Sequence, residues 1–309
     1  MILHTGNRTD IPAFYSRWFY RRLKEGYVLV RSPYDPSLVT RYEISKEVVD
    51  LIVFCTKNPA PMFPYMEAIA PYSKYWFVTV TPYGNEIEPG IRDKKRIINA
   101  FRKLSDIVGA NNICWRYDPI FIDKTYTTSY HIKAFEEMCR LLSGYTNTCV
   151  ISFLDIYQKV RRNFPQAKEV PLQDKLLLGK ALIDIGKKYN IKIKTCAEGN
   201  LLADAGADCS GCMTQKVFED AIGSKLVLPK GFKGSRKECS CILSSDIGAY
   251  DTCPHLCRYC YANSSTNAVI RNLRLHDPDS PLLVGRLMPE DKVVQANQES
   301  WIDMQISFL

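Results

Sequence analysis

The sequence predicts an α/β protein: a TIM-like (β/α) barrel, complete or partial, followed by a cysteine-rich C-terminal cap. Over residues 1–200, short β-rich runs alternate with helical patterns, and several of these runs are almost continuously apolar. Such alternation is typical of a parallel sheet whose helical crossovers cover both faces. A chain of 309 residues with 46% hydrophobic residues is long enough to bury the core of one barrel-sized domain.

Seven segments are predicted to be strands because they are short, rich in β-branched and aromatic residues, and bounded by polar or Pro-containing stretches. In chain order they are residues 2–5, 27–31, 51–56, 76–81, 113–117, 149–154 and 191–196. Strands separated by helices favour parallel pairing with right-handed crossovers. An eighth barrel unit is expected around residues 217–228.

Four segments between these strands are predicted to be helices. Two of them place large apolar residues on one helical face: Ile11, Phe14, Tyr15, Trp18 and Phe19 in the first, and Ile97, Ile98, Phe101, Leu104 and Val108 in the second. Helices are also expected over residues 128–142 and 172–188. We therefore assign residues 1–228 to the barrel and residues 229–309 to a cap and tail packed on it.

Polar side chains stand at the predicted end of strand after strand, where parallel barrels carry their chemistry. Cations there are suited to hold a carboxylate or phosphate, acids to orient ribose hydroxyls or move protons, and threonines to bind a cofactor. The cations are Arg8, Lys57 and Arg116, the acids are Asp10, Asp118 and Glu198, and the threonines are Thr79 and Thr81. A plain helix N-cap for Asp10 and a local Arg116–Asp118 ion pair are the structural alternatives.

Three cysteines near the C-terminus, Cys253, Cys257 and Cys260, have the spacing C-x3-C-x2-C, with Tyr259 directly before the last. Three thiolates can hold three corners of a [4Fe–4S] cluster, whereas an electron-transfer cluster takes four cysteines. One iron would then stay open to another ligand. A zinc site with His255 as fourth ligand is the alternative, although His255 is expected to be a surface or cap residue.

A second set of cysteines precedes this motif: Cys196, Cys209, Cys212, Cys239 and Cys241. Four thiolates suit an auxiliary [4Fe–4S] cluster or a structural zinc ion, and a set without metal is the third possibility. The remaining four, Cys55, Cys114, Cys139 and Cys149, lie in apolar segments and are expected to be small core residues.

Several segments resemble an uncharacterised bacterial and archaeal family that has a C-terminal cysteine cluster. These segments are Asn-Arg-Thr-Asp-Ile-Pro-Ala-Phe-Tyr at 7–15, Thr-Lys-Asn-Pro-Ala-Pro-Met at 56–62, Trp-Arg-Tyr-Asp-Pro-Ile at 115–120 and residues 236–263 and 276–283. The resemblance implies that Cys196, Cys212, Cys239 and Cys241 stand at positions where cysteine recurs in that family, and that Cys209 does not. A fainter similarity is to the spore photoproduct lyase group.

The cysteine motif and Tyr259 are also similar to the cluster motif of radical S-adenosylmethionine (SAM) enzymes. This resemblance implies that the open iron binds SAM, that Tyr259 lies near the adenine, and that reductive cleavage of SAM gives a 5′-deoxyadenosyl radical. It further implies an electron donor such as a ferredoxin or flavodoxin. The substrate is not indicated by any motif.

A metal-stabilised nucleic-acid-binding protein without radical chemistry is the alternative function. The net charge of +8 and the 11% aromatic residues permit it. No apolar stretch approaches the length of a membrane span, and the first residues lack the apolar core of a signal peptide. We therefore expect a cytoplasmic protein with no membrane partner.

Overall fold

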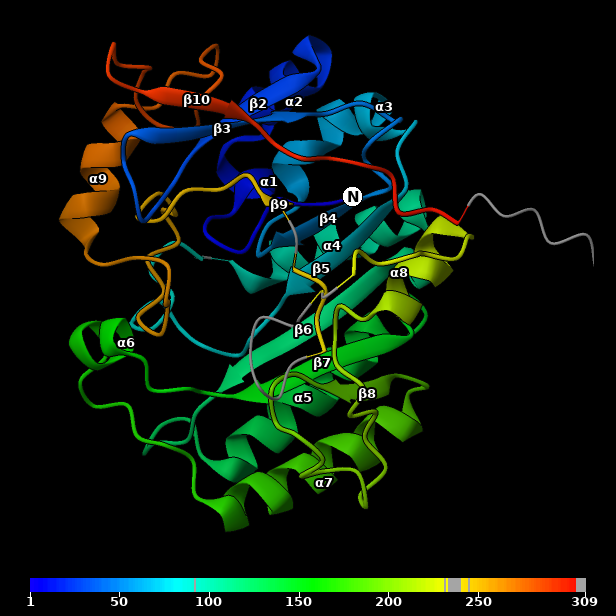
Figure 1. Ribbon diagram of the computed structural model, residues 1–309. Helices are drawn as coiled ribbons and strands as arrows, with labels where there is room; N and C mark the ends of the chain where they lie inside the picture. Colours follow the sequence, from blue (N-terminus) through cyan, green and yellow to red (C-terminus); the bar gives the residue numbers. More distant parts are fainter. Residues whose placement is uncertain (92, 231, 233–239, 244, 304–309) are drawn as a thin grey trace, which may run out of the picture.

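A seven-stranded sheet forms the centre of the computed structural model, which describes residues 1–91, 93–230, 232, 240–243 and 245–303 (Figure 1). The strand order is β8-β7-β6-β5-β4-β1-β9, and every recorded pairing within this sheet is parallel. The strands are β1 Ile2–His4, β4 Leu51–Thr56, β5 Lys74–Thr79, β6 Ile113–Ile120, β7 Thr148–Phe153, β8 Lys192–Thr195 and β9 Ser245–Asp246. The predicted α/β class with a parallel sheet is confirmed.

The sheet is open, with β8 at one edge and β9 at the other. Residues 217–228 do not supply the eighth barrel unit that we expected. Helix α8, Gln215–Ile222, occupies much of this segment, and Leu226 makes only an isolated bridge to Ile302. The place beside β1 is instead taken by β9, which comes from the cysteine-rich part of the chain.

Residues 27–31 form a strand, as predicted, but not in the central sheet. This strand, β2 (Tyr27–Arg31), pairs antiparallel with β3 (Leu38–Glu43), and β10 (Lys292–Gln295) joins β3 in parallel. Only residues 32–37 separate β2 from β3, and so short a connection permits a hairpin but no parallel crossover. The assignment of residues 27–31 to the barrel was therefore wrong.

Helices cover the central sheet and connect its strands. The long ones are α2 Ser16–Glu25, α4 Lys94–Val108, α5 Thr128–Leu142 and α7 Leu172–Lys188; the shorter ones are α1 Ile11–Phe14, η1 Ala60–Tyr65, α3 Met66–Ile69, η2 Ala110–Asn112, α6 Gln158–Asn163 and α9 Thr266–Arg274. The predicted bounds of α5 and α7 agree with the structure. The single helix expected over residues 11–19 is two helices separated at Tyr15. Asp93 and Thr127 cap α4 and α5 by accepting bonds from backbone N–H groups.

The core lies between the sheet and these helices and is rich in stacked aromatic rings. Trp76 stacks on Phe54 with ring centroids 4.0 Å apart, and Trp115 stacks on Phe135 at 4.8 Å. Full burial of such side chains stabilises the fold by about 1.5–3 kcal/mol each. Of the four cysteines expected in the core, Cys114, Cys139 and Cys149 are buried, whereas Cys55 is half-buried and faces a cavity.

The predicted cap contributes both to the central sheet and to the outer layer. It supplies β9 to the central sheet and β10 to the three-stranded sheet, and α9 lies at the periphery of the molecule (Figure 1). The boundary between barrel and cap at residue 228 stays a prediction. Within the described ranges, no helix has the length and apolar character needed to cross a bilayer.

Candidate functional site

A cavity of about 320 Å³ opens at the C-terminal ends of the sheet strands. Parallel strands bring these ends to one edge, and ligands of α/β proteins bind there. Most residues that the sequence pointed to line this cavity. They are Arg8, Asp10, Lys57, Thr79, Arg116, Asp118 and Tyr259, together with Cys196, Cys212, Cys241, Cys253, Cys257 and Cys260.

Three predicted site residues are not among those that line the cavity: Thr81, Glu198 and Cys209. Thr81 is buried and donates a hydrogen bond of 2.6 Å to Glu88. Glu198 accepts a bond from the Phe153 amide and pairs with Lys175 at 3.2 Å. A fourth predicted residue, Cys239, lies outside the described residues.

Each of the three predicted anion-binding cations pairs with a carboxylate. Arg8 Nε lies 3.3 Å from Asp246, and Lys57 Nζ lies 2.8 Å from Glu88. Arg116 and Asp118 form the ion pair that was the alternative interpretation, with a closest contact of 2.5 Å. Because β6 continues to Ile120, both residues lie within the strand rather than beyond it, on one face of the sheet.

Asp10 joins three segments through its carboxylate. One oxygen caps α1 by accepting from the Ala13 amide at 3.0 Å. The other accepts from the Lys57 amide at 2.8 Å and lies 2.9 Å from His255 Nε2. The N-cap alternative is therefore confirmed. The expectation that His255 is a surface or cap residue was wrong in its first part, because this ring is buried.

Glu88 is the centre of a buried polar network that the sequence did not reveal. Its side chain is fully buried and contacts the ammonium groups of Lys57 and Lys94, the Thr81 hydroxyl and the Tyr259 hydroxyl. Burial alone would raise the pKa of Glu88, but the two lysines outweigh it and lower the pKa to about 2. Two ammonium groups and one carboxylate leave one net positive charge beside the cysteine motif.

The cysteine motif is docked onto the loop that contains Glu88. The Gly90 amide donates to His255 O at 2.9 Å, and the Arg258 amide donates to Ile87 O at 3.0 Å. A β-carbon on Gly90 would lie 2.5 Å from the His255 Cα, so this position requires glycine. The two contacts hold the backbone on both sides of Cys257 against the loop that contains Glu88.

The thiols of Cys253, Cys257 and Cys260 face the cavity from this docked loop. Burial raises the pKa of all three, that of Cys257 to about 12. Without a bound cation they are therefore protonated at neutral pH. Lys57 counteracts this effect at Cys257 and Cys260. Such buried thiols become thiolates when a metal binds, since metal binding releases protons.

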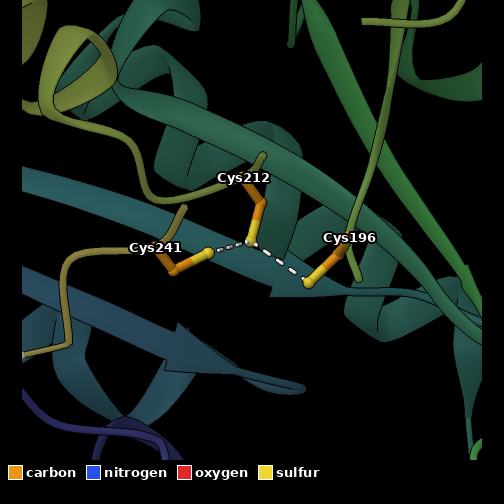
Figure 2. Close-up of side chains that lie close together, drawn as sticks. All are labelled: Cys196, Cys212 and Cys241. Carbon is orange, nitrogen blue, oxygen red and sulfur yellow. Dashed lines mark hydrogen bonds between the residues drawn. The ribbon is translucent and has the colours of Figure 1, made fainter. Parts of the chain in front are cut away.

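Three cysteines of the second set meet one another (Figure 2) and also line the cavity. Cys212 Sγ lies 3.5 Å from Cys196 Sγ and 3.3 Å from Cys241 Sγ, and the three sulfur atoms point toward one another. Cys196 directly follows β8, Cys212 lies in the loop before α8, and Cys241 lies before β9. The structure thus brings together residues separated by up to 45 positions, and it leaves Cys209 out of the group.

The sequence interpretation missed Glu88, Lys94 and the aromatic side chains of Tyr157 and Tyr261 that line the cavity. Glu88 stands in a loop, in the segment Asn-Glu-Ile-Glu-Pro, where acidic residues are common. The run Lys94-Lys95-Arg96 at the start of a predicted helix was the available signal, because cations are disfavoured at a helix N-terminus. Such placement indicates a nearby carboxylate.

Comparison with known families places the chain. A family model described as Domain of unknown function (DUF1848) matches residues 2–262, and the chain belongs to this family. No curated protein and no solved structure matches the chain. The expected membership of an uncharacterised family is confirmed over most of the chain.

Proposed function

We propose that this protein is a radical SAM enzyme whose [4Fe–4S] cluster is held by Cys253, Cys257 and Cys260. The observation that carries the proposal is the position of these thiols. A C-x3-C-x2-C loop from the far end of the chain lines the same cavity as the strand-end residues Lys57 and Thr79. A radical generated at that loop would be directly beside a substrate bound in the cavity at the strand ends.

The residues present fit a cluster with three protein ligands. In the part of the chain that the structure describes, the only cysteine group with sulfur atoms all within 4.8 Å is the second set. The three sulfur atoms of Cys253, Cys257 and Cys260 are therefore not all within 4.8 Å of one another. A wider spacing suits thiolates that bind three separate iron atoms of one cluster. His255, the candidate fourth ligand, directs Nε2 at Asp10. The positive charge of the Lys57–Glu88–Lys94 network offsets part of the anionic charge of three thiolates.

When bound, the cluster would supply one electron that cleaves SAM into methionine and a 5′-deoxyadenosyl radical, which takes a hydrogen atom from the substrate. The chain's own residues would bind and orient SAM and the substrate. The Tyr259 ring, fixed by its hydroxyl contact with Glu88, provides a flat surface for the adenine. Thr79 offers a hydroxyl to SAM, and the Arg116–Asp118 pair offers both charges to substrate.

The open sheet is proposed to act as a partial TIM-like barrel. Its strand ends form one wall of the cavity, and the cysteine loop forms the other. An enclosed site excludes water and side reactions from a reactive intermediate. We propose a cytoplasmic ferredoxin or flavodoxin as electron donor, since the chemistry requires a strong reductant.

Anaerobic reconstitution with iron and sulfide tests this function. The reduced protein should convert SAM to 5′-deoxyadenosine, measured by liquid chromatography. A variant with Cys257→Ala should lose both iron at this site and SAM cleavage. The matched control is Cys139→Ala, since Cys139 is a buried cysteine of α5 remote from the cavity. Failure of the iron-loaded wild-type protein to bind or cleave SAM would overturn the proposal.

A further inference from the structure

The second cysteine group stands between the two edges of the open sheet. Cys196 directly follows edge strand β8, and Cys241 lies four residues before edge strand β9. We infer that Cys196, Cys212 and Cys241 bind a single zinc ion that joins these edges. This inference does not depend on radical chemistry at the other cysteine motif.

The sulfur–sulfur distances fit one tetrahedral ion. A Zn–S bond of about 2.3 Å places two thiolates on one zinc about 3.8 Å apart. The observed separations of 3.5 and 3.3 Å, with all three sulfurs within 4.8 Å, are close to this value. A cubane puts each thiolate on its own iron corner and so holds the sulfurs farther apart. Of the alternatives that the sequence left open, the distances favour zinc.

The backbone around the three cysteines is already held in the arrangement that a shared ion requires. The Ile242 amide, next to Cys241, donates to the carbonyl oxygen of Met213, next to Cys212, at 2.8 Å. His4 of β1 places Nε2 3.1 Å from Ile242 O. Backbone and His4 contacts thus link two of the three ligand segments to each other and to the sheet.

The charge near the group is suited to thiolates. Arg116 Nη1 lies 3.9 Å from Cys212 Sγ, so a guanidinium faces the sulfur group. Zn²⁺ with three or four thiolates is an anion overall, and a nearby cation stabilises it.

A zinc ion at this position would close a sheet that the strands leave open. Residues 196–214 contain few large apolar side chains, and the next helix, α8, begins only at Gln215. Such a loop gains order from metal coordination, because the binding free energy of the metal becomes folding free energy. The ion would thus connect the β8 edge to the segment entering β9 and complete the cavity wall.

Metal analysis of the full chain tests the zinc site. In a variant with Cys253, Cys257 and Cys260 all changed to alanine, the protein should contain about one zinc per chain and no bound iron. Anaerobic incubation with iron and sulfide should leave this zinc in place. Loss of the zinc with uptake of about four irons would overturn the inference and establish a second cluster. Absence of both metals would overturn it equally.

Two further variants separate a built site from adventitious metal. Cys212→Ser should remove the zinc, whereas Cys209→Ser should retain it, because Cys209 lies outside the sulfur group. Chelation of the wild-type zinc should speed hydrogen exchange at β8 and β9 and leave central strand β5 unchanged. Equal zinc loss in both serine variants would contradict the proposed site. Hydrogen-exchange rates at β8 and β9 that stay the same after chelation would contradict the proposed link between the edges.

Discussion

Replacement of Glu88 by glutamine tests the buried network that supports the cysteine loop. The Glu88 carboxylate is fully buried between Lys57 and Lys94. Glu88→Gln keeps the shape of the side chain but leaves the partly buried ammonium groups of Lys57 and Lys94 without this counter-charge. Breaking a buried ion pair in this way costs about 3–5 kcal/mol.

The lowered pKa of Glu88 gives a second value for the free energy that this charged network contributes. The pKa of Glu88 falls from 4.5 to about 2, although burial by itself would raise it. Each pKa unit is worth about 1.4 kcal/mol, so the charged network contributes about 3 kcal/mol at neutral pH. Because the pKa is lowered on folding, this stability is complete above pH 4.5 and is lost as the pH falls towards 2.

Urea denaturation at pH 7 measures the effect. Glu88→Gln should lower the free energy of unfolding by about 3 kcal/mol, and the difference from wild type should shrink as the pH approaches the lowered pKa. The control is Glu137→Gln, which breaks an exposed pair with Arg140 and should leave the denaturation midpoint unchanged. If Glu88→Gln is as stable as wild type at pH 7, the network does not hold the charges that we assign to it.

Two further substitutions test the docking of the cysteine loop. Gly90→Ala should cost about 1–3 kcal/mol through overpacking and lower the iron content at the C-x3-C-x2-C motif, because its β-carbon would meet the His255 backbone at 2.5 Å. The control Gly109→Ala should also lose stability, because the φ of 84° at Gly109 strains an alanine, but it should retain the iron, since its β-carbon meets nothing within 4 Å. Asp10→Ala should cost about 3 kcal/mol in urea denaturation, since it removes an N-cap and takes away the partner of the Lys57 amide and of the buried His255 ring. Normal iron content in Gly90→Ala, or full stability in Asp10→Ala, would refute the respective contact.

Local patterns were sufficient to predict the long helices α4, α5 and α7 and most strands of the central sheet. The bounds of α5 and α7 were predicted correctly because their apolar residues recur with helical periodicity. Strand β2 was assigned to the wrong sheet because its β propensity is local, whereas its partner β3 is set by the short connection between them. Strand β9 has only two residues, too few to show any pattern.

The candidate site was partly predictable for the same physical reason. Residues at strand ends converge in any parallel sheet, so Lys57 and Thr79 were found from position alone. Glu88 lies in a loop, and its burial depends on the cysteine loop packing over it from the far end of the chain. No local pattern encodes such a contact. The meeting of Cys196, Cys212 and Cys241 likewise depends on the tertiary fold.

The two cysteine groups predict a single paramagnetic centre in the reduced protein. Zinc has no redox chemistry, so if Cys196, Cys212 and Cys241 hold zinc, only a cluster at Cys253, Cys257 and Cys260 can accept an electron. Electron paramagnetic resonance of the reduced protein should then integrate to about one spin per chain, and SAM should change the signal shape.

The spin count and the response to SAM answer different questions. About two spins per chain would exclude zinc at the second group but leave SAM chemistry at the first intact. One spin that SAM does not perturb would support zinc and refute the open iron. Both groups line one cavity, so a substrate that bridges them would be held between a site of electron entry and a fixed metal wall.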